Sequence, residues 1–352
     1  MKQRYDELNR QAWGMPDGKG KLALLEEAIR IADVYLTKDD AYEARMTYSS
    51  AALESGFPER LLVSFAWCLA RFEQHPEEHS SFTILWHYKW VLHQVWRLPQ
   101  LSLKQIDGLF DDFKAKCQQY GFSLRPYYQQ MLSYKQAQGN MEEAVHYYKL
   151  WKKTPRDGLS DCRACEQNQF GEYYFKRNQF KRGMGAMKPI LEGKLQCRSV
   201  PQNTYSQIIL PLLQLGEYEE AVRIARKAFR KIEGPSYLYE YGIFLAFFAV
   251  TDMEKAVKLY ERTIRLGLAC RMPWDRFHYL LAVKLFLGEW NRTKRRRKLA
   301  ESERVTPEWL DREVRSIAAA FDERNGNAYV TEWIGQQQRV MTKLAAAYRK
   351  EA

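Results

Sequence analysis

A short turn signature recurs five times along the chain and limits its fold more than any other feature. Each copy has a small or polar residue, an aromatic or apolar residue two places later and a small or short side chain five places later. The copies begin at Gly139, Asn178, Gly216, Thr251 and Gly288. The last positions fall at 144, 183, 221, 256 and 293, so the intervals are 39, 38, 35 and 37 residues. Such a period predicts an all-α solenoid of stacked antiparallel helical hairpins.

Apolar residues between the turns recur at helical spacing, as expected for two amphipathic helices in each unit. The clearest unit has Ile208, Ile209, Leu212 and Leu213 before its turn and Ala221, Val222, Ile224, Ala225, Ala228 and Phe229 after it. A small residue after the turn allows the two helices to approach closely where they cross. Prolines at 155, 201, 235, 273 and 307 predict the boundaries between units.

The two ends of the chain are less regular than the middle. Residues 22–36 and 38–51 predict one further hairpin, and 58–73, 80–96 and 102–119 predict helices without the turn signature. Two closing helices are expected at 306–321 and 326–350. We therefore divide the sequence into irregular hairpins over 1–124, repeats over 125–304 and capping helices over 305–352, because terminal units of a solenoid depart from the consensus.

The units resemble the tetratricopeptide repeat. The resemblance depends on the small and aromatic positions of the first helix, the turn, and the alanine, aromatic and boundary proline of the second. The matching residues are Gly171 and Tyr174, then Ala144, Tyr148, Trp151 and Pro155, and Tyr260. Gly183 and Thr293 stand where the family has alanine, and the periods exceed its usual length. The resemblance implies a right-handed superhelix whose concave groove binds peptides or protein segments, without enzyme activity.

Polar side chains are expected along the inward faces of successive first helices. Amides and hydroxyls there suit an extended peptide backbone, whereas the alternative interpretation makes them solvated helix surface. The candidate groove residues are Gln129, Ser133, Gln136, Asn168, Glu172, Lys176, Ser206, Tyr241 and His278.

Three cysteines form the candidate metal site. Cys162 and Cys165 have the Cys-x2-Cys spacing at the start of a predicted helix, and Cys197 follows the end of the second helix of the same hairpin. Those two points lie at the same end of an antiparallel hairpin. Three thiolates are therefore expected to converge, and a helix amino terminus favours the thiolate form that binds Zn²⁺.

A closed zinc site needs a fourth ligand, and the sequence leaves its identity open among Asp157, Asp161 and His146. Two other interpretations of the cysteines remain. They are ordinary reduced thiols, or a redox-active pair that lacks the strand and helix context of thioredoxin. If zinc is bound, its expected role is to fasten the hairpin rather than to catalyse a reaction.

The chain carries a net charge of +12, which favours an acidic partner. A run of five cations, Lys294, Arg295, Arg296, Arg297 and Lys298, is expected on a helix. Phosphate contact, a solvated basic face and a nuclear import signal are three interpretations of such a run. A nucleic-acid-binding helical-repeat protein is therefore the alternative to a peptide-binding scaffold.

Signatures of catalysis, export and membrane insertion are missing from the sequence. No phosphate-binding glycine loop, Gly-x-Ser-x-Gly elbow or His-Glu-x-x-His motif occurs, and His75 and His79 flank a loop that gives no helical face to a metal. The start lacks the apolar core of a signal peptide, and no apolar run is long enough for a membrane span. We expect a cytoplasmic, non-enzymatic scaffold that binds a peptide or protein.

Overall fold

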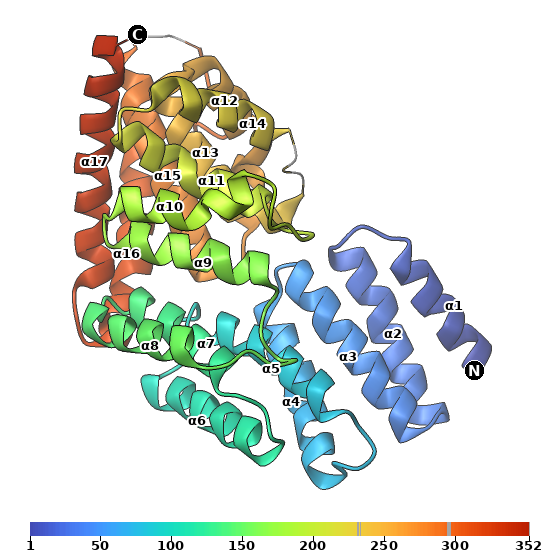
Figure 1. Ribbon diagram of the computed structural model, residues 1–352. Coiled ribbons are helices and arrows are strands. Elements are labelled where there is room, and N and C mark those ends of the chain that lie inside the picture. The colour runs from blue at the N-terminus through green and yellow to red at the C-terminus, as the bar shows by residue number, and fades with distance from the viewer. Residues whose placement is uncertain (231, 233, 294–296, 352) are drawn as a thin grey trace. The chain divides into compact units, whose positions relative to one another are not determined.

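The chain is all-helical, as the turn periodicity predicts. The computed structural model describes residues 1–230, 232, 234–293 and 297–351, and it has seventeen α-helices and no strand within them. Consecutive helices contact each other along most of the chain, as in an all-α repeat solenoid (Figure 1). The chain divides into two compact units, Met1–Ser160 and Asp161–Ala352. The boundary between Ser160 and Asp161 falls inside the predicted repeats of residues 125–304. The three regions expected from the regularity of the repeats, 1–124, 125–304 and 305–352, stay a prediction.

The first unit contains eight helices. They are α1 (Lys2–Trp13), α2 (Lys19–Tyr35), α3 (Lys38–Glu54), α4 (Pro58–Gln74), α5 (Ser81–Val95), α6 (Leu103–Gln119), α7 (Arg125–Ala137) and α8 (Met141–Lys153). Each of the helices predicted between 22 and 119 is therefore confirmed to within a few residues. The aromatic rings of Phe65, Tyr88 and Phe113 pack against one another in the core, and the Tyr88 hydroxyl donates to Asp112 at 2.9 Å.

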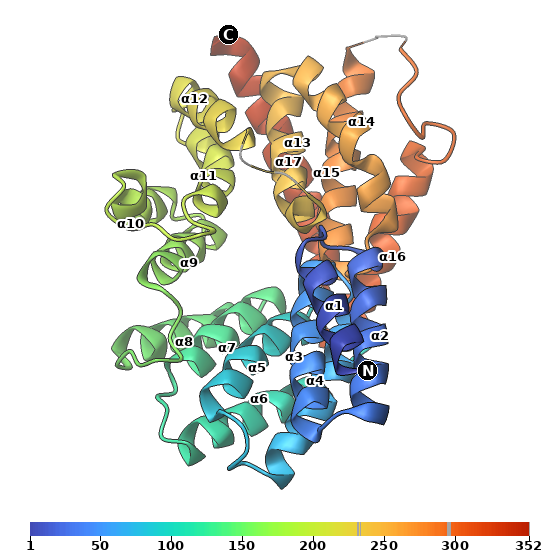
Figure 2. The ribbon, with the colours of Figure 1, turned by 90° about the vertical axis from the view of Figure 1, so that its right-hand side faces the viewer.

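The second unit continues the array with longer helices at its end. They are α9 (Arg163–Lys176), α10 (Phe180–Leu191), α11 (Gln202–Gln214), α12 (Tyr218–Phe229), α13 (Leu238–Thr251), α14 (Met253–Ala269), α15 (Pro273–Arg292), α16 (Pro307–Asn325) and α17 (Tyr329–Glu351), with a short 3-10 helix over Pro235–Tyr237. The last two confirm the predicted closing helices. Helices α13, α15 and α17 contact one another and run side by side (Figure 2).

The turn residues explain where the hairpins bend. Gly139, Asn178 and Gly216 have φ angles of 79°, 57° and 81°, a region that glycine and asparagine enter more readily than other residues. The next helix then begins with a polar cap in two of the copies. The Asn140 side chain accepts from the amide of Glu143 at 3.2 Å, and Asp252 accepts from that of Lys255 at 3.1 Å.

The small positions of four copies lie in helix contacts, as predicted. Ala144, Ala221 and Ala256 are almost completely buried. A Cβ atom on Gly183 would lie 2.3 Å from the ring of Phe175, which leaves no room for alanine in this unit. The departure from the tetratricopeptide pattern at position 183 therefore reflects local packing of α9 against α10.

The fifth copy is not a turn, so this prediction is wrong. Helix α15 continues through Gly288 to Arg292, and Thr293 is an exposed residue just past its end. The side chains after Gly288 stabilise the continuous helix. Trp290 is buried, and the buried carboxylate of Glu289 pairs with Arg292 and with Arg349 of α17. Glycine is tolerated in a helix, so its presence alone did not establish a bend.

Candidate metal centre and binding surfaces

The three candidate ligand thiols converge, as the hairpin geometry predicts. Cys162 is the residue before α9, Cys165 lies in the first turn of that helix, and Cys197 lies in the segment after α10. The sulfur atoms all lie within 4.8 Å of one another, and those of Cys165 and Cys197 are 3.5 Å apart. All three are free thiols, of which Cys162 is exposed and the others are half-buried. The cluster has the donor set and the spacing to bind a metal ion.

Backbone amides point at two of the sulfurs. The Cys162 sulfur caps α9 by accepting from the amide of Cys165 at 3.3 Å. Burial opposes ionisation of Cys197, but hydrogen bonds from the backbone of Ser199 and Val200 and from the neighbouring thiols bring its pKa below the ordinary value. Burial raises the pKa of Cys165. Cys197 is therefore the thiol of this pair that ionises first.

A small apolar cluster holds the thiols in place. Ala164, Ile190 and Val200 are buried together, and Cys165, Leu195 and Cys197 pack against them. The Cys197 amide also donates to the carbonyl of Val200 at 2.9 Å, which closes the turn that carries the third thiol. The start of α9 and the segment after α10 are thus joined by apolar contacts next to the sulfurs.

The described residues of the second unit provide no fourth ligand. No carboxylate or imidazole of that unit joins the three sulfurs within 4.8 Å. Asp161, one of the three candidates, therefore does not complete the site, and the other two, Asp157 and His146, belong to the first unit. The Asp157 carboxylate accepts from the amides of Ser123 at 2.6 Å and Leu159 at 3.0 Å within that unit.

The histidines of the 75–79 loop are placed beside acidic side chains. His75 lies with Glu77 and Glu78, and His79 with Asp39 and Glu78. The two histidines do not occur in one group, and each group offers one imidazole and two carboxylates. The ring of His79 stacks on Tyr42 with centroids 3.7 Å apart, so packing accounts for its position.

The predicted groove residues differ widely in exposure. In the first unit Gln129 and Gln136 are buried and Ser133 is half-buried. In the second unit Asn168, Ser206 and Tyr241 are buried, Glu172 and His278 are half-buried, and Lys176 is exposed and paired with Glu172. A role for these nine residues in binding a peptide stays a prediction.

Several buried groove residues have partners within the helix stack. Asn168 of α9 accepts from the Thr204 hydroxyl of α11 at 2.6 Å, and the Ser206 hydroxyl donates to the carbonyl of Asn203 at 2.8 Å. The ring of His278 lies 4.8 Å from that of Trp333 in α17. The contacts of Asn168 and His278 join different helices, whereas that of Ser206 stays within α11.

The basic run is not part of a helix where it can be described. Lys294, Arg295 and Arg296 lie outside the described residues. Arg297 and Lys298 are non-helical, so the prediction of a helix is wrong for these two. Arg297 pairs with Glu261 of α14 at 2.8 Å, and Lys298 pairs with Glu303 at 2.6 Å.

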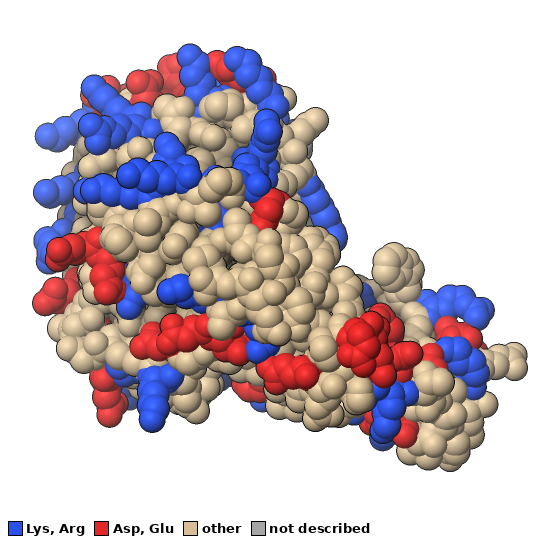
Figure 3. All heavy atoms as spheres, turned by 60° about the horizontal axis from the view of Figure 1, so that its bottom comes forward, with Lys and Arg blue, Asp and Glu red and all other residues tan. Residues whose placement is uncertain are grey.

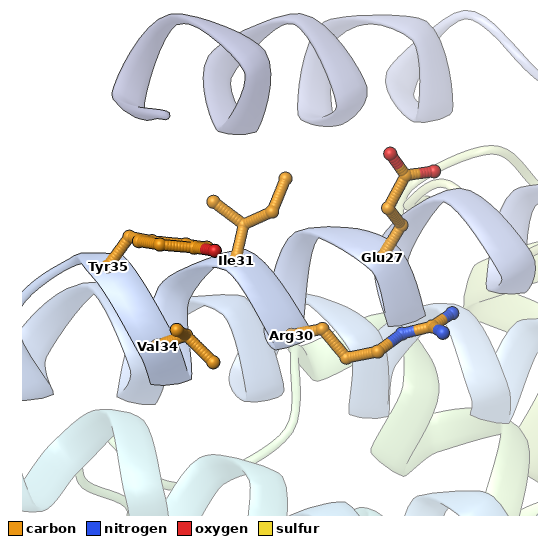
Figure 4. Close-up of a pocket in the computed structure, with 5 residues that line it drawn as sticks. All are labelled: Glu27, Arg30, Ile31, Val34 and Tyr35. Atoms are coloured by element: carbon orange, nitrogen blue, oxygen red, sulfur yellow. The ribbon is translucent and has the colours of Figure 1, made fainter.

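Sequence reasoning missed an exposed face of α2. Arg30, Ile31, Val34 and Tyr35, together with Glu27, line a shallow hollow of about 330 Å³ (Figure 4). Val34 and Tyr35 are 69% and 59% exposed, although both are large apolar side chains. The available signal was a second apolar face, because Val34 and Tyr35 do not belong to the buried series of Leu22, Leu25, Ala28, Ile31 and Ala32.

Among the described residues, none of the helices combines the length and the apolar run that a membrane crossing requires.

No protein-family model matches this sequence, and no curated protein is significantly similar to it.

Proposed function

We propose that this chain is a non-enzymatic helical-repeat scaffold that binds a segment of another protein. The observation that carries the proposal is the uneven exposure of apolar side chains. Every large hydrophobic residue exposed in the described part of the chain lies within the first 82 residues. These residues are Met1, Trp13, Met15, Val34, Tyr35, Val63 and Phe82. Of these, Val34 and Tyr35 are neighbours on α2 and line one hollow, and a contiguous exposed apolar patch is typical of an interaction site.

The exposed face of α2 suits an amphipathic helix of the partner. Val34 and Tyr35 are exposed beside the buried Ile31 and give a small apolar surface, which an apolar stripe of another helix can cover. Glu27 is already paired with Arg4 at 3.0 Å. Arg30 is exposed and forms no ion pair with any described residue, so it is available to an acidic residue beside the partner's apolar stripe.

This site differs from the concave groove that the tetratricopeptide resemblance implies. Binding of a peptide in that groove is therefore a second proposed contact. We also propose that the chain belongs to that family and lies in the cytoplasm. Reduced thiols support the location, since the six cysteines form no disulfide within the described residues.

We further propose that Cys162, Cys165 and Cys197 hold a Zn²⁺ ion. Zn–S bonds of about 2.3 Å in a tetrahedron place two sulfurs roughly 3.8 Å apart. The 3.5 Å between Cys165 and Cys197 is close to that value, and the third sulfur lies within 4.8 Å. The ion would fasten the ends of the α9–α10 hairpin, with the fourth position taken by water or by a ligand from outside the described residues.

Site-specific photo-cross-linking tests the protein-binding proposal. A benzoylphenylalanine replaces Val34 in one variant and the exposed Lys149 of α8 in a control. We expect Val34, and not Lys149, to capture one protein, whose cross-linked segment is amphipathic. That segment, made as a peptide, should bind the wild-type chain and lose about tenfold in affinity for Arg30→Glu, because a favourable charge contact becomes a repulsive one.

Three outcomes would overturn this assignment. Equal capture from Val34 and Lys149 would mark the contacts as nonspecific, and unchanged affinity of Arg30→Glu would remove the acidic partner residue. A cross-linked dimer of this chain would assign the α2 face to self-association instead. Circular dichroism of each variant establishes that the helices remain folded.

A further inference from the structure

Positive charge is concentrated in the second unit. Residues 161–352 contain 34 Lys and Arg against 23 Asp and Glu, a net charge of +11, whereas residues 1–160 contain 21 against 20. Almost the whole net charge of the chain therefore belongs to one unit. Figure 3 shows Lys and Arg side chains gathered in the upper left of the view.

Exposed cations form stripes on the second helices of two consecutive hairpins. They occupy positions 223, 226 and 227 of α12 and position 230 at its C-cap, and positions 258, 262 and 265 of α14. Each set follows the three-and-four spacing of one helix face. The opposite faces are buried, with Ile224 and Ala228 on α12 and Tyr260 and Ile264 on α14. We call the two stripes together the basic face; it comprises Arg223, Arg226, Lys227, Arg230, Lys258, Arg262 and Arg265.

The two stripes lie next to each other. The guanidinium of Arg262 on α14 sits 4.9 Å from the ring centroid of Phe229 on α12, so a residue of one stripe contacts the helix that carries the other. This contact also holds the Arg262 side chain against the protein surface. This contact joins the two stripes at the end of α12, and the basic face comprises both of them.

Many cations of the basic face have no acidic partner. Arg223 pairs with Glu220, and Arg265 pairs with Glu301. Arg226, Arg230 and Lys258 are exposed and form no ion pair within 4 Å with any described residue, although the charge of Arg226 contributes to the lowered pKa of Asp252. The acidic residues of these helices lie mainly in the first turns, at Glu219, Glu220 and Glu254, where the helix dipole favours them.

We propose that the basic face binds the phosphate backbone of a nucleic acid, independently of the protein-binding proposal for α2. Protein interfaces depend on buried apolar anchors, chiefly aromatic side chains. The described residues of the second unit expose no large hydrophobic side chain. Phosphate contacts need only cations and hydrogen-bond donors, and they bind without reading bases. Charge without apolar anchors therefore favours a nucleic acid over an acidic protein.

Fluorescence anisotropy with a labelled 30-nucleotide RNA of mixed sequence tests the proposal at several salt concentrations. The test variant is Arg226→Ala/Arg230→Ala/Lys258→Ala. The control, Lys149→Ala/Lys152→Ala/Lys153→Ala, removes the same charge from exposed positions of α8. Each lost phosphate contact lowers the slope of log affinity against log salt by about 0.7 for a single strand, so three contacts lower it by about 2. Such a slope difference corresponds to roughly a hundredfold in affinity between 1 M and 0.1 M salt.

We expect the test variant to show the lower slope and the weaker binding, and the control to bind like the wild type. Equal losses in the two variants would reduce the effect to overall charge and overturn the proposal, as would the absence of salt-dependent binding by the wild type. Polyglutamate that competes as well as unlabelled RNA would assign the basic face to an acidic protein instead. Thermal melting of both variants identifies any loss that comes from unfolding. Loss of cross-linking at Val34 would leave this result unchanged, so the two proposals fail separately.

Discussion

Removal of zinc should destabilise the second unit more than any other change at the candidate metal centre. The ion would connect the residues that begin α9 with the segment after α10, and the unfolded chain does not bring these sulfurs together. A ligand present at 100 times its dissociation constant stabilises the folded state by about 2.7 kcal/mol. One kcal/mol corresponds to roughly 2–4 °C in a domain of this size, so we expect chelation to lower the melting temperature by roughly 8 °C.

The assay compares metal content and melting temperature in the same samples. Protein purified without chelator should contain one zinc per chain by mass spectrometry of the metal. Cys162→Ser, Cys165→Ser and Cys197→Ser should each lose the ion and show little further change with EDTA. Cys270→Ser is the matched control, because Cys270 lies in the same unit and its sulfur donates to the carbonyl of Met272 instead.

Two results would refute the reasoning about the metal. If the wild type contains no zinc and EDTA leaves its melting temperature unchanged, the thiols are ordinary reduced cysteines. If mild oxidation instead gives a Cys165–Cys197 disulfide that a dithiol reductant reverses, while no metal binds, the redox interpretation is correct. The 3.5 Å between these sulfurs makes such a bond accessible with little movement.

The remaining predictions concern packing and pH. Gly267→Ala should destabilise the chain by about 1–3 kcal/mol in urea unfolding, because the new Cβ would lie 2.2 Å from the buried ring of Tyr279. Gly288→Ala has no atom within 4 Å of the new Cβ and should raise the free energy of unfolding by about 0.5–1 kcal/mol. Equal effects of the two variants would contradict the packing of these helices. Burial lowers the pKa of His87 to about 4, so the folded state keeps this histidine neutral while the unfolded chain protonates it below about 6.5. The free energy of unfolding should therefore fall by up to roughly 3 kcal/mol as pH decreases from about 6.5 to about 4. In unfolding measured as a function of pH, His87→Gln should lose less stability over the same range. Parallel stability curves of the variant and the wild type would rule out His87 as the cause.

Local chemistry accounts for what the sequence predicted well. Gly139, Asn178 and Gly216 adopt left-handed backbone angles that few other residues tolerate, so their positions identify turns directly. The convergence of the three thiols then follows from the direction of the two helices between them. Neither inference needs knowledge of contacts between distant residues.

Predictions that depended on packing were less successful. Gly288 resembles the turn glycines, but the buried Trp290 and the ion pairs of Glu289 with Arg292 and Arg349 keep the helix continuous. The exposure of Val34 was also missed, because its position off the buried series of α2 shows a second apolar face but not whether a neighbouring helix covers that face. The polar positions expected to face a groove, such as Ser206, are likewise placed by helix packing.

The single-residue junction at Asp252 has a consequence for how this array can change in length. Asp252 ends α13, where its amide donates to the carbonyl of Phe248 at 2.8 Å, and also caps α14. An inserted residue there must unwind one of the two helices. The longer segments 154–162 and 192–201 between hairpins carry the variation in repeat period. Insertions and engineered tags should therefore be tolerated at the exposed start of the second segment, residues 192–194, but not at the junction. They should not be tolerated in the first segment, where Leu159 and Ser160 are buried and Cys162 is a candidate ligand.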